Sequence, residues 1–204
     1  MNKRTKALFY DIDGTLLSEK TGRVPDSARQ ALQEARSRGH LVFINTGRVY
    51  CHLVSIRSQV EADGFLCGCG THVVAQGQVL YSHHIPHERG LKIKRDIDEC
   101  GLDGALEGTE GCYFHRTVSA IPGIEELKAS VRGAGCPCPY DWEDDCYDFD
   151  KFYLGSDENS RCMELFGRLK DMDIIDRGRG YYECVPRGHS KATAIDLVLK
   201  HYGI

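Results

Sequence analysis

Two carboxylates one residue apart follow a short apolar run near the start of the sequence. The run is Ala7–Tyr10, and Asp11 and Asp13 come directly after it, with Gly14 next. A run of this length and composition predicts a strand buried on both faces, and the glycine allows a sharp turn. Ligands bind at the carboxyl ends of strands in open parallel α/β sheets. The carboxylate pair is therefore expected at a ligand site.

The spacing of Asp11 and Asp13 suits phosphoryl transfer. One carboxylate can attack phosphorus and form an aspartyl-phosphate, while a second acid protonates the leaving oxygen and then activates water. Two carboxylates this close repel each other, which favours a cation or a shared proton between them. An acidic turn that merely closes a strand is the simpler alternative. A calcium loop is excluded because Thr15 and Leu16 stand where further acidic ligands are needed.

A second polar turn follows the next predicted strand. Residues 25–39 predict a helix that ends at Gly39, and residues 40–44 predict a buried strand that leads into Asn45-Thr46-Gly47-Arg48. Strand, helix and strand in this order fit a parallel crossover, which would place Thr46 next to Asp11. A hydroxyl and free backbone N–H groups at such a turn suit a phosphate oxygen.

A third segment, residues 186–192, precedes a predicted C-terminal helix. Ser190 is a plausible N-cap, and apolar residues between 192 and 199 form a helical face. Lys191 then falls in the first turn, where the helix dipole disfavours a cation unless an anion lies nearby. An anion-paired lysine and a solvent-facing lysine are both consistent with the local sequence.

Composition limits the classes of partner. The 204 residues include 26 basic and 30 acidic side chains, for a formal charge of −4, and contain no long basic run. Nucleic acid and anionic membranes are therefore not expected partners. No apolar run reaches membrane-spanning length, and residues 1–6 lead into a strand without a signal-type apolar region. We expect a cytoplasmic protein.

Ten cysteines, two pairs of them spaced C-x-C, are interpreted as free thiols rather than a disulfide framework, because the chain is expected to be cytoplasmic. They are Cys51, Cys67, Cys69, Cys100, Cys112, Cys136, Cys138, Cys146, Cys162 and Cys184. A metal site that uses Cys136, Cys138 and Cys146 is the alternative, although the spacing is not that of a zinc ribbon.

The chain changes character near His83. Before it, a helix over 50–60 and a strand over 65–67 precede a hairpin over 73–81. After it, we predict helices over 88–100, 124–133 and 158–170, and strands over 112–116, 152–154 and 180–184. These form a separate α/β unit of ordinary domain size. The acidic run 141–150 is interpreted as a solvated loop, with Trp142 as the one residue that favours a substrate contact.

Three segments in a fixed order resemble a known family. They are DIDGTL at 11–16, NTGR at 45–48 and GHSKATAI at 188–195. Together they resemble the haloacid dehalogenase superfamily, specifically the Cof-like type IIB branch. The resemblance covers nearly the whole chain, and the DxDGT segment is its most specific part. It implies an α/β fold with a Rossmann-like parallel-sheet core, formed by residues 1–82 and 184–204, and an inserted α/β cap domain, residues 83–183.

The resemblance also implies a Mg²⁺-dependent phosphatase that acts on a small phosphorylated metabolite such as a sugar phosphate. In it, Asp11 is the nucleophile and Asp13 the acid and base. Thr46 and Gly47 hold phosphoryl oxygens, and Lys191 neutralises charge on the nucleophile and the phosphate. The metal is held by the Asp11 carboxylate and the Asp13 backbone carbonyl.

The sequence departs from the family pattern at its C-terminal end. The family's fourth motif, a GDxxND-like segment with a further metal ligand, does not follow Lys191; the similar residues 155–159 precede it, and a helix cap is their expected role. We expect an incomplete core in which strand 6–10 has an unpaired edge. Truncation is the favoured explanation, ahead of a second chain that completes the core or a natural degenerate protein. Two smaller departures are Cys69, in place of an Asn, and His189, interpreted as a solvated loop residue.

Three functions follow as hypotheses. The first is the phosphatase, of which this chain would be a weakly active or inactive fragment. The second is a non-catalytic protein that binds a phosphorylated ligand and lacks the last metal ligand. The third is a thiol-rich metal-binding protein.

Overall fold

The computed structural model describes residues 5–18 and 20–204, so most of the stretch 1–6 that precedes the first predicted strand lies outside the described residues. The chain divides into two compact units. The first comprises the described residues up to Ser82 together with His189–Ile204, and the second is His83–Gly188. The second boundary lies five residues later than the sequence analysis placed it, because the last strand of the second unit continues to Pro186.

The first unit contains a five-stranded mixed sheet in the order β1-β2-β3-β4-β5. Its strands are β1 (Ala7–Tyr10), β2 (Leu41–Asn45), β3 (Gly64–Cys67), β4 (His72–Ala75) and β5 (Gln78–Ser82). β1, β2 and β3 are parallel, with Tyr10 opposite Ile44 and Asn45 opposite Leu66. β3–β4 and β4–β5 are antiparallel, so the predicted hairpin is confirmed.

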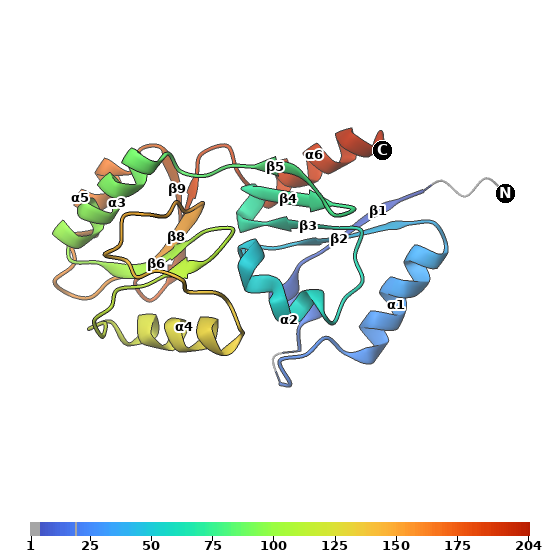
Figure 1. Cartoon of the computed structure of the whole chain (residues 1–204), viewed down its shortest axis with the longest axis horizontal. Helices are drawn as coiled ribbons and strands as arrows, with labels where there is room; N and C mark the ends of the chain where they lie inside the picture. The colour runs from blue at the N-terminus through green and yellow to red at the C-terminus, as the bar shows by residue number, and fades with distance from the viewer. Residues whose placement is uncertain (1–4, 19) are drawn as a thin grey trace. The chain divides into compact units, whose positions relative to one another are not determined.

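Helices cover both faces of this sheet, as Figure 1 shows for α1 (Asp26–Ser37) and α2 (Val54–Arg57) on one side and α6 (Lys191–Tyr202) on the other. Side chains that alternate along a strand point to opposite faces. Val42 and Ile44 accordingly pack with the α1 and α2 side of the core. Phe43, between them, packs against α6. The apolar run of β2 is therefore continuous because both of its faces are buried.

The start of α6 agrees with the sequence prediction, whereas the helix predicted over 50–60 is not formed as one helix. Ser190 caps α6: its side chain accepts a hydrogen bond from the Thr193 N–H, and the Thr193 hydroxyl accepts one from the Ser190 N–H. This reciprocal pair fixes the position of Lys191 at the first turn. The helix predicted over 50–60 is instead a short 3₁₀ turn, Tyr50–Leu53, followed by the single turn of α2.

The second unit contains a five-stranded sheet in the order β7-β6-β8-β10-β9, with every pair antiparallel. Its strands are β6 (Asp103–Glu107), β7 (Cys112–Tyr113), β8 (Lys151–Gly155), β9 (Met172–Gly178) and β10 (Tyr181–Pro186). Its helices are α3 (His87–Glu99), α4 (Pro122–Gly133) and α5 (Cys162–Arg168). In Figure 1 the sheet lies between α3 and α5 on one side and α4 on the other.

One face of this second sheet is apolar and packs on α3 and α5, through residues such as Leu106, Phe152 and Leu154. β6 and β9 were not predicted. β9 carries four charged or glycine positions in seven residues, and these residue types are depleted in strands. The helix expected over 158–170 begins only at Cys162, and its N-cap, Arg161, makes no side-chain cap. The expected capping role of residues 155–159 is therefore wrong.

Within the described residues, β1 is the edge strand of the first sheet, as expected from the sequence. Its four residues are only half-buried, in contrast to the fully buried Val42–Asn45 of β2. The carboxyl end of β1 is where the first acidic pair begins. None of the helices in the described chain is both long and apolar enough to cross a membrane.

Candidate active site

The turn after β1 fixes the first carboxylate. The Ile12 N–H donates a hydrogen bond of 2.8 Å to Asp11 Oδ1, and the Leu17 N–H closes the turn on the Ile12 carbonyl oxygen at 2.9 Å. Gly14 has a φ of +71°, a backbone region that favours glycine, so the turn favours a glycine directly after Asp13. The turn thus orients Asp11 through Oδ1, and the second oxygen, Oδ2, takes no part in that hydrogen bond.

Lys191 supplies the partner of that second oxygen. Its ammonium forms a hydrogen-bonded ion pair with Asp11 Oδ2, although the two residues are 180 positions apart. Both side chains are partly exposed. The question left open by the sequence, whether an anion accompanies this lysine at the start of α6, is therefore answered: the anion is Asp11. The pairing offsets the unfavourable position of a cation at a helix N-terminus.

The turn after β2 lies beside this pair. Because Tyr10 stands opposite Ile44 in the parallel ladder, Asp11 and Asn45 leave the sheet at neighbouring strand ends. The Asn45 side-chain amide donates a 3.0 Å hydrogen bond to the Lys191 carbonyl oxygen, which ties the second segment to the third. The Asn45 Oδ1 atom is buried and has no hydrogen-bond partner in the described chain.

Thr46 and Gly47 follow in that turn. Thr46 is fully buried, and its Oγ1 accepts a 3.1 Å hydrogen bond from the Arg48 N–H. That contact uses an acceptor position of the hydroxyl and leaves its proton available to donate. Within the described residues, no hydrogen bond involves the Gly47 N–H. The structure brings Asp11 and Lys191 into contact and places Thr46 one residue beyond Asn45, with no hydrogen bond in the described chain between Thr46 and either of them.

Arg48, for which the sequence alone indicated no role, contacts Asp13. Arg48 Nε lies 2.9 Å from Asp13 Oδ2, and Nη2 lies 2.6 Å from Oδ1. This is the two-pronged geometry in which guanidinium and carboxylate fit best. The sequence did carry a signal for this contact. Arg48 ends the second polar turn, and the strand–helix–strand order places that turn next to the acidic one.

A fourth turn, Gly68–Gly70, supports the start of α6. A Cβ at Gly70 would lie 2.5 Å from the Ser190 carbonyl oxygen, so only glycine allows this close approach. His189 was expected to be a solvated loop residue, and this is wrong. Its Nε2 lies 2.8 Å from the Tyr81 hydroxyl, and the two rings are 5.8 Å apart. The loop that carries Lys191 is therefore held by β5 as well as by Gly70.

The residues near Asp11 fit Mg²⁺ in kind. Mg²⁺ takes oxygen ligands and is commonly held by one or two carboxylates with several waters. The Asp11 carboxylate, already accepting from one N–H and one ammonium, and the Asp13 backbone carbonyl are ligands of this type. In the part of the chain that the structure describes, no third acidic or histidine side chain gathers with these two aspartates.

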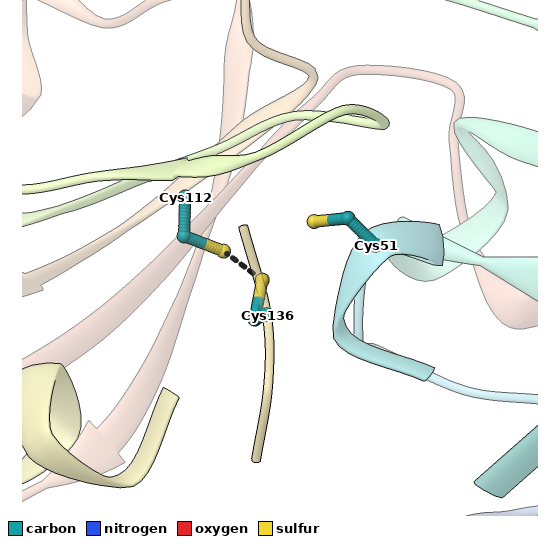
Figure 2. Close-up of side chains that lie close together, drawn as sticks. All are labelled: Cys51, Cys112 and Cys136. Atoms are coloured by element: carbon teal, nitrogen blue, oxygen red, sulfur yellow. Dashed lines mark hydrogen bonds between the residues drawn. The ribbon is translucent and has the colours of Figure 1, made fainter. Parts of the chain in front are cut away.

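The cysteines do not form the metal site that the sequence left open. Cys136, Cys138 and Cys146 do not come together as a ligand set within the described residues, and none of the ten cysteines is in a disulfide. Figure 2 shows instead that the sulfurs of Cys112 and Cys136 face each other, and they are 3.5 Å apart. Trp142 is 1 % exposed and belongs to the core of the second unit, so it is not available as a substrate contact.

Taken together, the first unit has an α/β fold in which two aspartates, a lysine and a buried threonine turn meet at the carboxyl ends of adjacent parallel strands. Such an arrangement can bind an anionic group and supply a carboxylate nucleophile. A family model described as haloacid dehalogenase-like hydrolase matches residues 8–204. The chain therefore belongs to the haloacid dehalogenase-like hydrolases, in their Cof-like branch.

Comparison with individual proteins agrees with this assignment. A Bacillus subtilis (strain 168) protein named "Putative phosphatase YkrA" is 30 % identical over 201 residues, which are 96 % of this chain and 74 % of that protein. A hypothetical protein from Geobacillus kaustophilus HTA426 has a TM-score of 0.80 and 25 % identity, and the match covers 98 % of this chain and 77 % of that one.

A solved sugar phosphatase of subclass IIB, BT4131, has a TM-score of 0.76 at 22 % identity, over 98 % of this chain and 77 % of that one. At this identity the likeness concerns the fold. The chain thus spans about three quarters of the length of each of these three proteins.

Proposed function

We propose that this chain acts as a Mg²⁺-dependent phosphatase that hydrolyses small phosphomonoesters through an aspartyl-phosphate. The observation that carries the proposal is the ion pair between the Lys191 ammonium and Asp11 Oδ2 at the carboxyl end of β1. A lysine that returns from 180 residues away to this carboxylate neutralises charge where a phosphate dianion would approach it. Phosphoryl transfer depends mainly on such positioning and charge stabilisation.

In the first half-reaction, a carboxylate oxygen of Asp11 attacks phosphorus, and the bond from phosphorus to the ester oxygen breaks. Asp13, in its protonated form, gives its proton to that leaving oxygen, so the alcohol departs neutral. Lys191 offsets the negative charge shared by Asp11 and the phosphoryl group. The Thr46 hydroxyl proton and the Gly47 N–H donate to phosphoryl oxygens, since neither is used elsewhere in the described chain.

In the second half-reaction, Asp13 takes a proton from a water molecule that attacks the phosphorus of the aspartyl-phosphate. The bond between phosphorus and the Asp11 oxygen breaks, inorganic phosphate leaves, and both carboxylates return to their starting forms. The Asp11 carboxylate and the Asp13 carbonyl oxygen would hold Mg²⁺, which when bound neutralises phosphate charge and orients the phosphoryl group.

Substrate choice is proposed to lie with the second unit, His83–Gly188, as a cap domain, and a sugar phosphate is the proposed class because the family resemblance implies it. The exposed edge of β1 provides unpaired backbone groups in the described sheet. We propose that a further strand, from a second chain or from a segment outside this sequence, pairs with that edge.

The test is phosphate release from a panel of phosphomonoesters with and without Mg²⁺. The wild type should release phosphate, and Asp11→Asn should lose at least about a thousandfold of that rate because the nucleophile is removed. Asp26→Asn, which changes an exposed aspartate on α1, is the matched control and should retain the wild-type rate. Acid-quenched wild-type protein should carry a phosphoryl group on Asp11. An Asp11→Asn variant as active as the wild type would refute the assignment.

A non-catalytic phospho-ligand-binding protein is the second candidate. It is favoured by one observation: the described residues supply no third acidic ligand at this position. Calorimetry with a sugar phosphate distinguishes the two, because the binding protein would give stable titration heats and no free phosphate, with or without Mg²⁺.

A further inference from the structure

The Asp13 carboxylate has one hydrogen-bond partner in the described chain, the guanidinium of Arg48. The two contacts, 2.9 and 2.6 Å, join different turns whose residues lie 35 positions apart in the sequence. The Asp13 side chain is 57 % exposed, whereas that of Arg48 is only 22 % exposed. The Asp13 carboxylate is therefore largely exposed to solvent, and the partly covered guanidinium of Arg48 is the group that holds its direction.

The backbone of Arg48 is fixed on both sides. Its N–H donates to Thr46 Oγ1 at 3.1 Å, and its carbonyl oxygen accepts from the Gly68 N–H at 2.9 Å. The Thr46 N–H in turn donates to the Leu66 carbonyl oxygen of β3 at 2.8 Å. The guanidinium thus projects from a turn that is anchored to the sheet, and a planar, forked donor on such an anchor sets the direction of a carboxylate.

This contact differs from an ordinary surface ion pair. Arg29 and Asp26 on α1 are also paired, but they are neighbours on one exposed helix face, and pairs of that kind contribute little. Arg48 and Asp13 instead connect two turns at the site, and they divide the two neighbouring carboxylates between two cations. Asp11 is paired with the compact ammonium of Lys191, while Asp13 is held by the forked guanidinium.

We propose that Arg48 is a positioning residue, which orients the Asp13 carboxyl group for proton transfer to the leaving oxygen. This inference depends on the function proposed above. Its consequence follows from the chemistry of the step: the bond between phosphorus and the ester oxygen breaks, and the proton goes from the Asp13 carboxyl to that oxygen. An alkoxide is a poor leaving group and needs this proton, whereas p-nitrophenolate leaves well without it.

The experiment compares two substrates, a primary sugar phosphate and p-nitrophenyl phosphate, in wild type, Arg48→Ala and Arg48→Lys. With the sugar phosphate, Arg48→Ala should lower kcat by about 10- to 100-fold, because displacing an acid by about 1 Å has effects of this size. With p-nitrophenyl phosphate, kcat should change by less than about threefold. KM should stay close to the wild-type value for both substrates, because Arg48 is not assigned to bind phosphate.

Arg48→Lys should recover only part of the loss, since an ammonium cannot supply the two parallel donors. Arg29→Ala removes an exposed arginine from the same unit and should leave both rates unchanged. A thermal melt of each variant separates misfolding from the specific effect. An equal loss on both substrates, or a rise in KM alone, would overturn the positioning role and assign Arg48 to structure or to phosphate binding.

Nuclear magnetic resonance tests the contact independently of turnover. The Arg48 Nε–H signal, identified by its absence in Arg48→Lys, should be protected from solvent exchange in the wild type and lose that protection in Asp13→Asn. An Arg48 signal that is unaffected by Asp13→Asn would overturn the inference while leaving the phosphatase untouched. A wild-type protein that releases no phosphate from either substrate would instead count against the function proposed above, and the role of Arg48 would fall with it.

Discussion

Glu183, in the second unit, gives the clearest test of how buried charge stabilises this fold. It lies on β10 beside Lys151 of β8, whose Nζ is 2.7 Å from Glu183 Oε1 and 2.5 Å from Glu107 Oε2 on β6. Arg177 of β9 donates from Nε to Glu183 Oε2 at 3.0 Å. The side chains of Glu183, Lys151 and Glu107 are buried and lie on three adjacent strands.

Burial by itself raises the pKa of Glu183, but Lys151 and Arg177 outweigh that effect and lower the pKa from 4.5 to about 2. A carboxyl group whose pKa is lower in the folded state stabilises the fold above its unfolded pKa. That contribution disappears as the pH falls through the folded value. At 1.36 kcal/mol for each pKa unit, the contribution at pH 7 is about 3 kcal/mol, and roughly half of it remains at pH 3.

The perturbation is Glu183→Gln, and the assay is urea unfolding between pH 7 and pH 3. The chain has one tryptophan, and Trp142 is buried in the core of the second unit, so its fluorescence reports the unfolding of that unit. We expect the variant to be less stable by about 3 kcal/mol at pH 7 and by about half as much at pH 3. Glu164→Gln, which changes an exposed side chain on α5, is the control and should change the transition little. A difference between Glu183→Gln and wild type that stays constant with pH would refute the reasoning.

Two further predictions concern the close backbone approach at Gly70 and the pair of thiols at Cys112 and Cys136. Gly70→Ala should cost about 1–3 kcal/mol, because its Cβ would approach the Ser190 carbonyl oxygen and its φ is +95°. Gly77→Ala, at a φ of +76° with open space around it, should cost less in the same thermal melts, and equal costs would show that the close approach is unimportant. Diamide, which is reduced as it takes two hydrogens from a pair of thiols, should link Cys112 to Cys136, whose sulfurs are 3.5 Å apart. Peptide mapping that recovers both cysteines separately alkylated would contradict this geometry.

Local sequence predicted the parts of the fold that depend on short-range rules. The strands β1 and β2 follow from short continuous apolar runs, and the hairpin of β4 and β5 follows from its turn residues. The start of α6 follows from the capping preference of Ser190. β9 was missed because an edge strand tolerates charged residues that strand propensity argues against.

At the candidate active site, the sequence by itself determined which residue types are present and in what order, because an acidic pair, a threonine turn and a capped lysine are local patterns. Local patterns did not give their partners: the family resemblance implied that Lys191 acts on Asp11, and the tertiary structure alone supplied Arg48 as the partner of Asp13. Lys191 pairs with Asp11, and Arg48 pairs with Asp13, because the order of β1 and β2 and the packing of α6 bring distant turns to one edge of the sheet. Local sequence rules act over a few residues, whereas these contacts join residues 35 and 180 positions apart, so no local pattern specified them.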